Sequence, residues 1–194
     1  MERVQRVKEL SRDKFLTPDE CARLCSVPKL STTKGLRDYA MLKVFLNCGL
    51  RKMELLNLKV KDFQHQGSDY WFVVHSKGGA IDEQDVLSYK VIEAVNKYLN
   101  RVGHANDLEA PLFQPIKGRS KRADGSLSRR CIDELIKKCA RRAGIAKKIH
   151  CHTLRHTFGT ELLTLTGDIK VVQKAMRHSA LTSTMIYLHT DRER

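Results

Sequence analysis

Residues 150–156, HCHTLRH, place three histidines, a cysteine and an arginine within seven positions. Such a cluster can bind a metal ion or a phosphate group, or it can simply mark the start of a helix. His152 and His156 have the i, i+4 spacing that binds zinc on a helix, but no glutamate stands between them as in HExxH. Arg155 would also repel a dication on that face, so the sequence predicts no metal site.

The phosphate interpretation suits these residue types better. His152 and Arg155 are three residues apart near an expected helix start, so their side chains project to one side. A guanidinium group can bind two phosphate oxygens, and the positive end of the helix dipole adds to the attraction. An HxxR pair alone is weak, because many such pairs occur by chance on protein surfaces.

Two other stretches contain residues suited to the same chemistry. GLRKMELL places Arg51 just after Gly49, with Glu54 one turn later, although the pair could be a surface ion pair worth a few tenths of a kcal/mol. MRHSALTSTMIYLH contains His178 and, nine residues on, Tyr187. Tyr187 could instead be a core aromatic, since the chain has four other tyrosines.

The charge distribution points to a polyanionic partner. The formal net charge is +14, and residues 117–148 hold twelve Lys or Arg against three acids. An excess of one sign favours binding to nucleic acid. An anionic membrane surface is the weaker alternative, because this segment lacks an apolar face to bury.

Composition limits the class of protein. Hydrophobic content of 41% and charged content of 30% over 194 residues are typical of one globular domain with at most a short appendage. There is no apolar run of about 20 residues for a membrane span and no secretory signal at the start. The six cysteines form no CxxC pair, which favours reduced thiols and a cytoplasmic location.

The periodicity predicts a mainly α fold with a small antiparallel β-sheet, in the α+β class. Thr17 and Ser128 are expected to cap helices, Gly49 and Gly144 to end them, and the aromatic, β-branched run 70–75 with glycines at 78–79 to form a hairpin or small sheet. The expected helices cover 17–27, 35–49, a short stretch after Gly49, 90–103, 128–144, 154–166, 168–177 and 181–189.

Taken in order, four of these stretches resemble the tyrosine recombinase, or phage integrase, family. The family pattern has a GLRxxEL arginine, a lysine on a β-hairpin, an HxLRH box, and a G-H box whose histidine precedes a nucleophilic tyrosine by nine residues. This chain has CGLRKMELLNL, VVHSKGG, CHTLRHTFGTEL and MRHSALTSTMIYLH, in that order, between about Leu16 and His189. The resemblance implies the catalytic-domain fold of that family over 16–190, after an extension or linker at 1–15 and before a short tail at 191–194.

The resemblance also implies a set of catalytic roles. Tyr187 would attack a DNA phosphate and form a 3′-phosphotyrosine, which conserves the bond energy so that strands rejoin without ATP or another cofactor. Arg51 and Arg155 would bind the non-bridging oxygens, His178 would donate a hydrogen bond to the phosphate, and His152 would take the tyrosine proton. Lys77 would protonate the leaving 5′ oxygen.

Glu54 is expected to hold Arg51 and the local helices and not to react. Two departures from the family pattern stand out. The hairpin SKGGAIDEQDVLS is acidic and lacks the usual following Arg and Pro, and Arg177 replaces the glycine before His178. A glycine there often relieves a backbone constraint, so Arg177 either changes the local geometry or adds a phosphate contact.

The implied partner is double-stranded DNA, bound by a protein that is monomeric alone and forms a tetrameric synapse on DNA. The candidate DNA-binding residues are Lys117, Arg119, Lys121, Arg122, Arg129, Arg130 and Arg177. Family members usually have an N-terminal core-binding domain, and about sixteen residues before the first helix are too few for one. The expectation is therefore a catalytic-domain fragment or a minimal member with weak, salt-sensitive DNA binding. A catalytically inactive DNA-binding module and strand relaxation of the type IB topoisomerase kind remain the alternatives.

Overall fold

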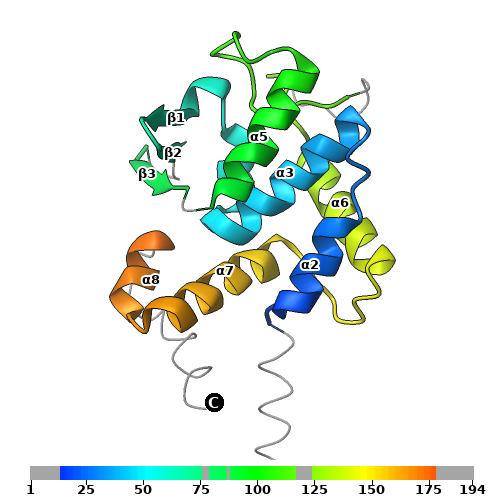
Figure 1. Cartoon of the computed structure of the whole chain (residues 1–194), viewed down its shortest axis with the longest axis vertical. Coiled ribbons are helices and arrows are strands. Elements are labelled where there is room, and N and C mark those ends of the chain that lie inside the picture. Colours follow the sequence, from blue (N-terminus) through cyan, green and yellow to red (C-terminus); the bar gives the residue numbers. More distant parts are fainter. Residues whose placement is uncertain (1–13, 76–78, 87, 117–123, 178–194) are drawn as a thin grey trace, which may run out of the picture.

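The computed structural model describes residues 14–75, 79–86, 88–116 and 124–177. Most of the described elements are helices, and one small sheet lies on one side of them (Figure 1), which is the mainly helical fold with a small sheet that the periodicity predicted. The elements are α2 (Pro18–Ser26), α3 (Thr33–Cys48), α4 (Lys52–Asn57), the 3-10 helix η1 (Val60–Asp62), β1 (Phe63–Gln66), β2 (Asp69–His75), β3 (Ile81–Asp85), α5 (Tyr89–Val102), α6 (Arg129–Arg142), α7 (Cys151–Thr166) and α8 (Ile169–Ala175).

Polar caps set most helix ends where the sequence predicts them. Thr17 and Glu20 form a reciprocal capping box at the start of α2, and Ser128 caps α6. Gly49 ends α3 in the left-handed conformation, with φ 58°. Two starts were predicted too late: Thr32 caps α3, and the His150 ring caps α7 by accepting a hydrogen bond from a backbone N–H. A histidine cap is unusual, so the α7 start was hard to read from the sequence.

The sheet is a three-stranded antiparallel meander in the order β1-β2-β3. The hairpin prediction covered β2 and β3, but β1 was not foreseen because FQHQ is short and mostly polar. Phe63 pairs with Phe72 across β1 and β2, and their rings lie 5.1 Å apart. That contact secures the strand to the core.

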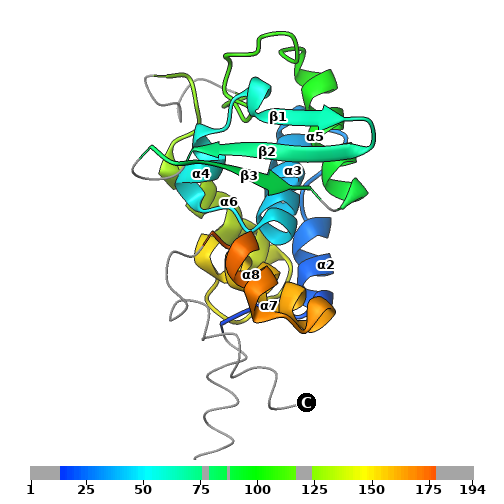
Figure 2. The same cartoon turned by 90° about the vertical axis from the view of Figure 1, so that its left-hand side faces the viewer.

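Helix α3 lies at the centre of the fold, which explains its weak amphipathicity. Eleven of its sixteen residues are buried, with α5 and α7 packed against different parts of its surface. The sheet covers the side of α3 and α5 that faces the viewer in Figure 2. Tyr98 of α5 is fully buried, and its hydroxyl accepts a hydrogen bond from the backbone N–H of Gln114.

Helices α7 and α8 form the lower part of the molecule in both views. A small apolar cluster of Phe158, Leu163, Val172 and Met176 holds them together. The Leu16 backbone N–H donates to the Thr157 hydroxyl at 2.9 Å and joins the start of α2 to α7. None of the helices in the ranges described is long and apolar enough to cross a membrane.

Candidate functional site

A cleft of about 1160 Å³ lies between α4, the hairpin, the start of α6, and α8 with the turn that follows it. Six Lys or Arg side chains line it against two acidic ones, so it carries positive charge. The lining residues are Arg51, Lys52, Met53, Glu54, Asn57, His75, Ala80, Asp82, Arg129, Lys170, Gln173, Lys174 and Arg177. Such a cleft suits a phosphate-bearing ligand.

Glu54 is the organising residue of the cleft. Its carboxylate is 5% exposed, and Oε1 accepts from Arg51 Nη1 at 2.6 Å while Oε2 accepts from the Arg51 backbone N–H at 2.7 Å. Burial raises the pKa of Glu54, but Arg177 and Arg51 together outweigh burial and leave that pKa below its usual value. The Glu54 carboxylate is therefore charged at neutral pH and holds Arg51, whose own side chain is 45% exposed towards the cleft.

Arg155 reaches the same carboxylate from α7. Its guanidinium is 3% exposed, donates to the backbone carbonyls of Gly49 and Met176, and lies 3.9 Å from Glu54 Oε2. The two arginines predicted to bind one phosphate, 104 positions apart in the sequence, thus meet at a single carboxylate. Both Nη atoms of Arg155 donate to backbone carbonyls, which fix the guanidinium beside Glu54, and Arg155 is not among the residues that line the cleft.

Arg177 also points inward. Its Nη2 donates to Glu54 Oε2 at 2.7 Å, its Nη1 donates to the Gln84 side-chain carbonyl on β3, and its side chain is 8% exposed. Its backbone carbonyl accepts from Arg51 Nη2 at 3.2 Å. The residue lies at φ 50°, in the left-handed region where the family pattern has glycine.

The histidines of HCHTLRH lie along the first turns of α7. The rings of His152 and His156 meet edge to face with centroids 5.1 Å apart. Burial, followed by the charges of Arg155, His150 and Arg51, lowers the pKa of His152, which is therefore neutral at pH 7. Burial lowers the pKa of His156 further, to about 4. In the described part of the chain no group of His, Cys, Asp or Glu side chains could hold a metal ion.

Several predicted site residues fall outside the described ranges: Lys77, His178, Tyr187, Lys117, Arg119, Lys121 and Arg122. The described neighbours of two of them, Lys77 and His178, reach the cleft. His75 and Ala80, on either side of Lys77 in sequence, line it, as does Arg177, the residue before His178. Arg129 lines the cleft at the start of α6, and Arg130 is exposed and paired with Glu134.

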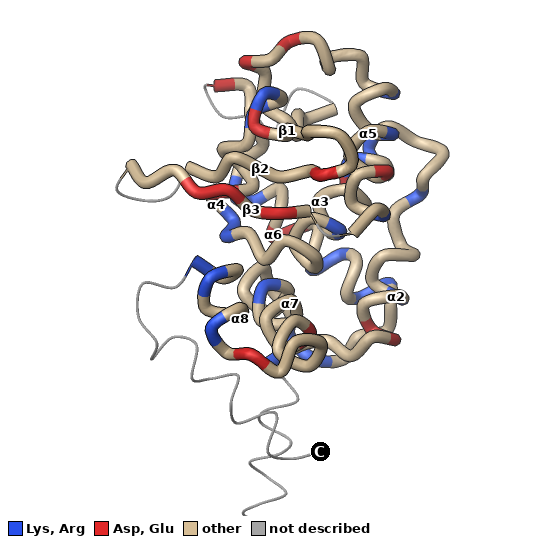
Figure 3. The backbone as a smooth tube through the Cα atoms, turned by 60° about the vertical axis from the view of Figure 1, so that its left-hand side comes forward, with Lys and Arg blue, Asp and Glu red and all other residues tan. Residues whose placement is uncertain are grey.

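The structure adds residues that the sequence did not single out. Lys170 and Lys174 lie one turn apart on α8 and are exposed, and their i, i+4 spacing beside Arg177 was the available signal. Gln84 is the one buried residue of β3, and nothing in IDEQD marks it as a partner of a residue 93 positions away. Figure 3 shows the acidic residues of β3 next to the basic ones of α4 and α8.

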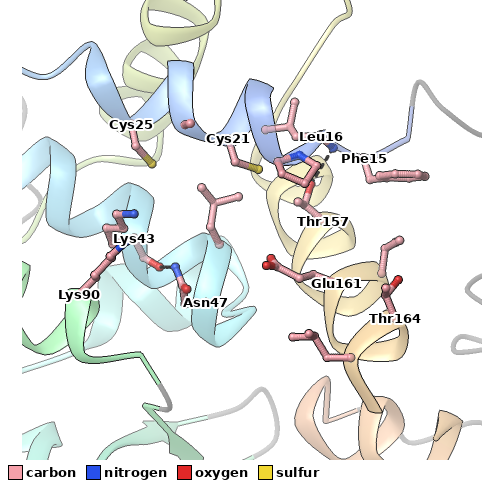
Figure 4. Close-up of a pocket in the computed structure, with 15 residues that line it drawn as sticks. Phe15, Leu16, Cys21, Cys25, Lys43, Asn47, Lys90, Thr157, Glu161 and Thr164 are labelled. Atoms are coloured by element: carbon pink, nitrogen blue, oxygen red, sulfur yellow. Dashed lines mark hydrogen bonds between the residues drawn. The ribbon is translucent and has the colours of Figure 1, made fainter. Parts of the chain in front are cut away.

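A second cavity, of about 540 Å³, lies between α2, α3 and α7 (Figure 4). It shares no lining residue with the basic cleft that Arg51 and Arg177 line, which is called the arginine cleft from here on. Cys21 and Cys25 line it, but burial raises the pKa of the Cys21 thiol to about 12 and also raises that of Cys25. These thiols are therefore protonated and poor nucleophiles at neutral pH, and this cavity lacks the chemistry of the cleft.

Comparison with known proteins agrees with this geometry. The model of the phage integrase family matches residues 14–194. Tyrosine recombinase XerC of Thermodesulfovibrio yellowstonii is 34% identical over 185 residues, which cover 92% of this chain and 58% of that protein. The solved structure of XerA recombinase superposes with a TM-score of 0.72 at 28% identity, over 93% of this chain and 65% of that one.

A structure of XerH recombinase, at 22% identity, has the same fold, with a TM-score of 0.75 over 93% of this chain and 50% of that one. The chain therefore spans between half and two thirds of the length of these relatives. The arginine cleft, the helical fold with its three-stranded sheet, and the match over nearly all of the sequence lead to one conclusion: the chain belongs to the phage integrase family of tyrosine recombinases.

Proposed function

We propose that this chain is the catalytic part of a site-specific DNA recombinase, which cuts and rejoins strands through a 3′-phosphotyrosine on Tyr187. The observation that carries the proposal is the convergence of Arg51 and Arg155 on Glu54 at the edge of a basic cleft. Two guanidinium groups fixed in advance can stabilise the negative charge that grows on the non-bridging oxygens as phosphorus becomes pentacoordinate.

We assign the proton transfers to the residues that the family resemblance indicates. The Tyr187 hydroxyl gives its proton to His152, which is neutral and can accept it, and the phenolate oxygen bonds to phosphorus. The bond from phosphorus to the 5′ oxygen breaks, and Lys77 supplies the proton that this oxygen takes up. His178 donates a hydrogen bond to the phosphate. Attack by a 5′ hydroxyl on the phosphotyrosine reverses these steps and joins the strand.

DNA as the substrate is supported by the net charge of +14 and by the basic lining of the cleft. The XerH structure is described as bound to its palindromic difH substrate after cleavage. We propose the same class of partner here, with a monomer that assembles into a tetramer on DNA. Gel-shift titrations should give an affinity that falls steeply with salt, whereas nanomolar binding independent of salt would contradict this mode of binding.

The decisive experiment traps the covalent intermediate. A pool of suicide duplexes of randomised sequence, each with a nick that lets the cleaved fragment diffuse away, is incubated with the protein and resolved on a denaturing gel. A protein–DNA adduct is expected, with none from Tyr187→Phe. Binding without an adduct from any duplex would favour an inactive DNA-binding module, and relaxation of supercoiled plasmid without recombination would favour topoisomerase activity.

A further inference from the structure

Arg177 adopts a backbone conformation that is costly for its residue type. It is the one residue other than glycine with positive φ in the described ranges, at 50°. A side chain in the left-handed region crowds the following carbonyl oxygen, which is why glycine usually occupies such positions. Strain of this kind persists where the surroundings hold the residue in place, so the contacts of Arg177 must compensate for it.

Those contacts connect three elements. The guanidinium group donates hydrogen bonds to Glu54 of α4, at 2.7 Å, and to Gln84 of β3. The backbone carbonyl of Arg177 accepts a hydrogen bond from the Arg51 side chain at 3.2 Å. Gln84 is itself 6% exposed and lies opposite Phe72 in the sheet, so its position is fixed. Arg177 Nε is buried and has no hydrogen-bond partner among the described residues. The side chain is thus committed to the protein interior.

Arg177 is also the largest single source of the positive charge that stabilises the Glu54 carboxylate. After burial, which opposes ionisation, the charge of Arg177 is the largest influence on the Glu54 pKa and lowers it. Arg51 lies 2.6 Å from Glu54, but its side chain is 45% exposed, and the buried Arg155 lies 3.9 Å away, so neither is a buried guanidinium in direct contact, as Arg177 is at 2.7 Å. Without Arg177, the carboxylate that orients Arg51 would lose its nearest buried cation.

We propose that Arg177 is a positioning residue: it fixes the Glu54 carboxylate and strand β3 so that Arg51 is presented to a phosphate in the cleft. The sequence indicated a direct contact between Arg177 and DNA, and the positioning role takes the place of that contact. This role rests on the proposed function. Because β3 follows the segment that contains Lys77, the same contact ties the hairpin to the arginine pair. Arg177 acts through Glu54 and Gln84 and not on the substrate.

A double-mutant cycle over Arg177→Met and Glu54→Gln tests this role. Each single variant should slow adduct formation by about 10- to 100-fold, since a displacement of about 1 Å in a positioning group has effects of this size. The double variant should be no more than about threefold slower than the worse single variant, because both changes break one connection. Lys97→Met, which removes an exposed charge on α5 paired only with Glu93 among the described contacts, is the control and should keep the starting rate.

Two further readouts separate positioning from a phosphate contact and from general instability. Loss of a phosphate contact would lower the slope of log affinity against log salt by about one, and Arg177→Met should leave that slope unchanged. The rate of adduct formation by Arg177→Met should also be lost towards acid pH with a midpoint at higher pH than for the unchanged chain. The reason is that Glu54 becomes easier to protonate when Arg177 is removed. Variants that carry Glu54→Gln should keep only the acid limb that protonation of His152 sets, without the upward shift.

Thermal unfolding of the same four proteins gives a readout that needs no catalysis. Arg177→Met should lower Tm by roughly 5–10 °C, and by far less when Glu54→Gln is already present. Additive effects in the cycle, or a reduced salt slope, would overturn the positioning role. If the unchanged chain forms no adduct, the proposed function fails, and the unfolding cycle then tests the structural half of the inference: coupling supports the contact through which Arg177 fixes Glu54, and additivity overturns it.

Discussion

At the scale of single residues, one buried carboxylate organises guanidinium groups from three distant parts of the chain. Glu54 meets Arg51 three positions away, Arg155 from α7 and Arg177 from the turn after α8. The pair of Arg51 and Glu54 could be predicted from its i, i+3 spacing. The link from Arg177 to Gln84 could not, because it spans 93 positions and depends on how β3 packs against that turn.

The lowered pKa of His152 makes a prediction for the pH dependence of cleavage. A base must be neutral, so the second-order rate of adduct formation at limiting DNA should fall with decreasing pH, with a midpoint below the ordinary 6.5. His150→Asn removes one neighbouring positive charge and keeps a helix cap, so it should move that midpoint upward. Rates measured from pH 4.5 to 8 check both; an unshifted midpoint at or above 6.5 would remove His152 as the base.

At the scale of elements, the site depends on where helices end. The C-terminal end of α3 brings the Gly49 carbonyl to Arg155, and His150 sets where α7 begins. Threonine, serine and glycine caps could be read from the sequence because their preferences are local. The His150 cap and strand β1 could not, since long-range packing and not local preference fixes them.

Gly49 should be the least replaceable glycine near the site. A Cβ at this position would lie 2.3 Å from Phe158 Cδ1, and φ is 58°. Gly49→Ala should therefore lower the free energy of unfolding by roughly 2–4 kcal/mol, from overpacking added to the left-handed strain. Gly103→Ala is the matched control: its φ is 81° but no atom lies within 4 Å of its Cβ, so about 1 kcal/mol is expected. Urea unfolding measures both, and equal losses would contradict the close contact with Phe158.

At the scale of the whole molecule, the fold class followed from periodicity and composition, and the helical domain with its small sheet confirms it. The charge excess of residues 117–148 pointed to a polyanion, and α6 displays part of it, since Arg129, Arg130, Lys137 and Lys138 are all exposed. Sequence could not show that the cleft itself would be lined by Lys170 and Lys174, because α8 is placed only by packing against α7.

Stability should decrease as the pH falls from about 6.5 towards 4, before most carboxylates titrate. The folded-state pKa of His156 is about 4, against the ordinary histidine value of 6.5. Between these two pKa values the unfolded chain therefore binds a proton that the folded chain does not bind, so the free energy of unfolding decreases as the pH is lowered. Discounted for partial exposure, the loss is about 1–2 kcal/mol between pH 7 and 5. His156→Gln should keep only the smaller loss of stability that is due to His152. Urea unfolding at pH 7 and pH 5 measures this loss in both proteins, and an equal loss in the variant and in the unchanged chain would contradict the prediction.

The central claim is that Arg51 neutralises charge on the phosphate that Tyr187 attacks. The most direct measurement replaces that phosphate, once the trapped adduct has located it, by an uncharged methylphosphonate and compares cleavage rates. On ordinary DNA, Arg51→Ala should be slower than the unchanged chain by about 10²- to 10³-fold. On the methylphosphonate the deficit should shrink to less than about tenfold, because the pentacoordinate state then carries one negative charge fewer and Arg155 remains to stabilise the charge that still develops. An equal deficit on both substrates would contradict the account.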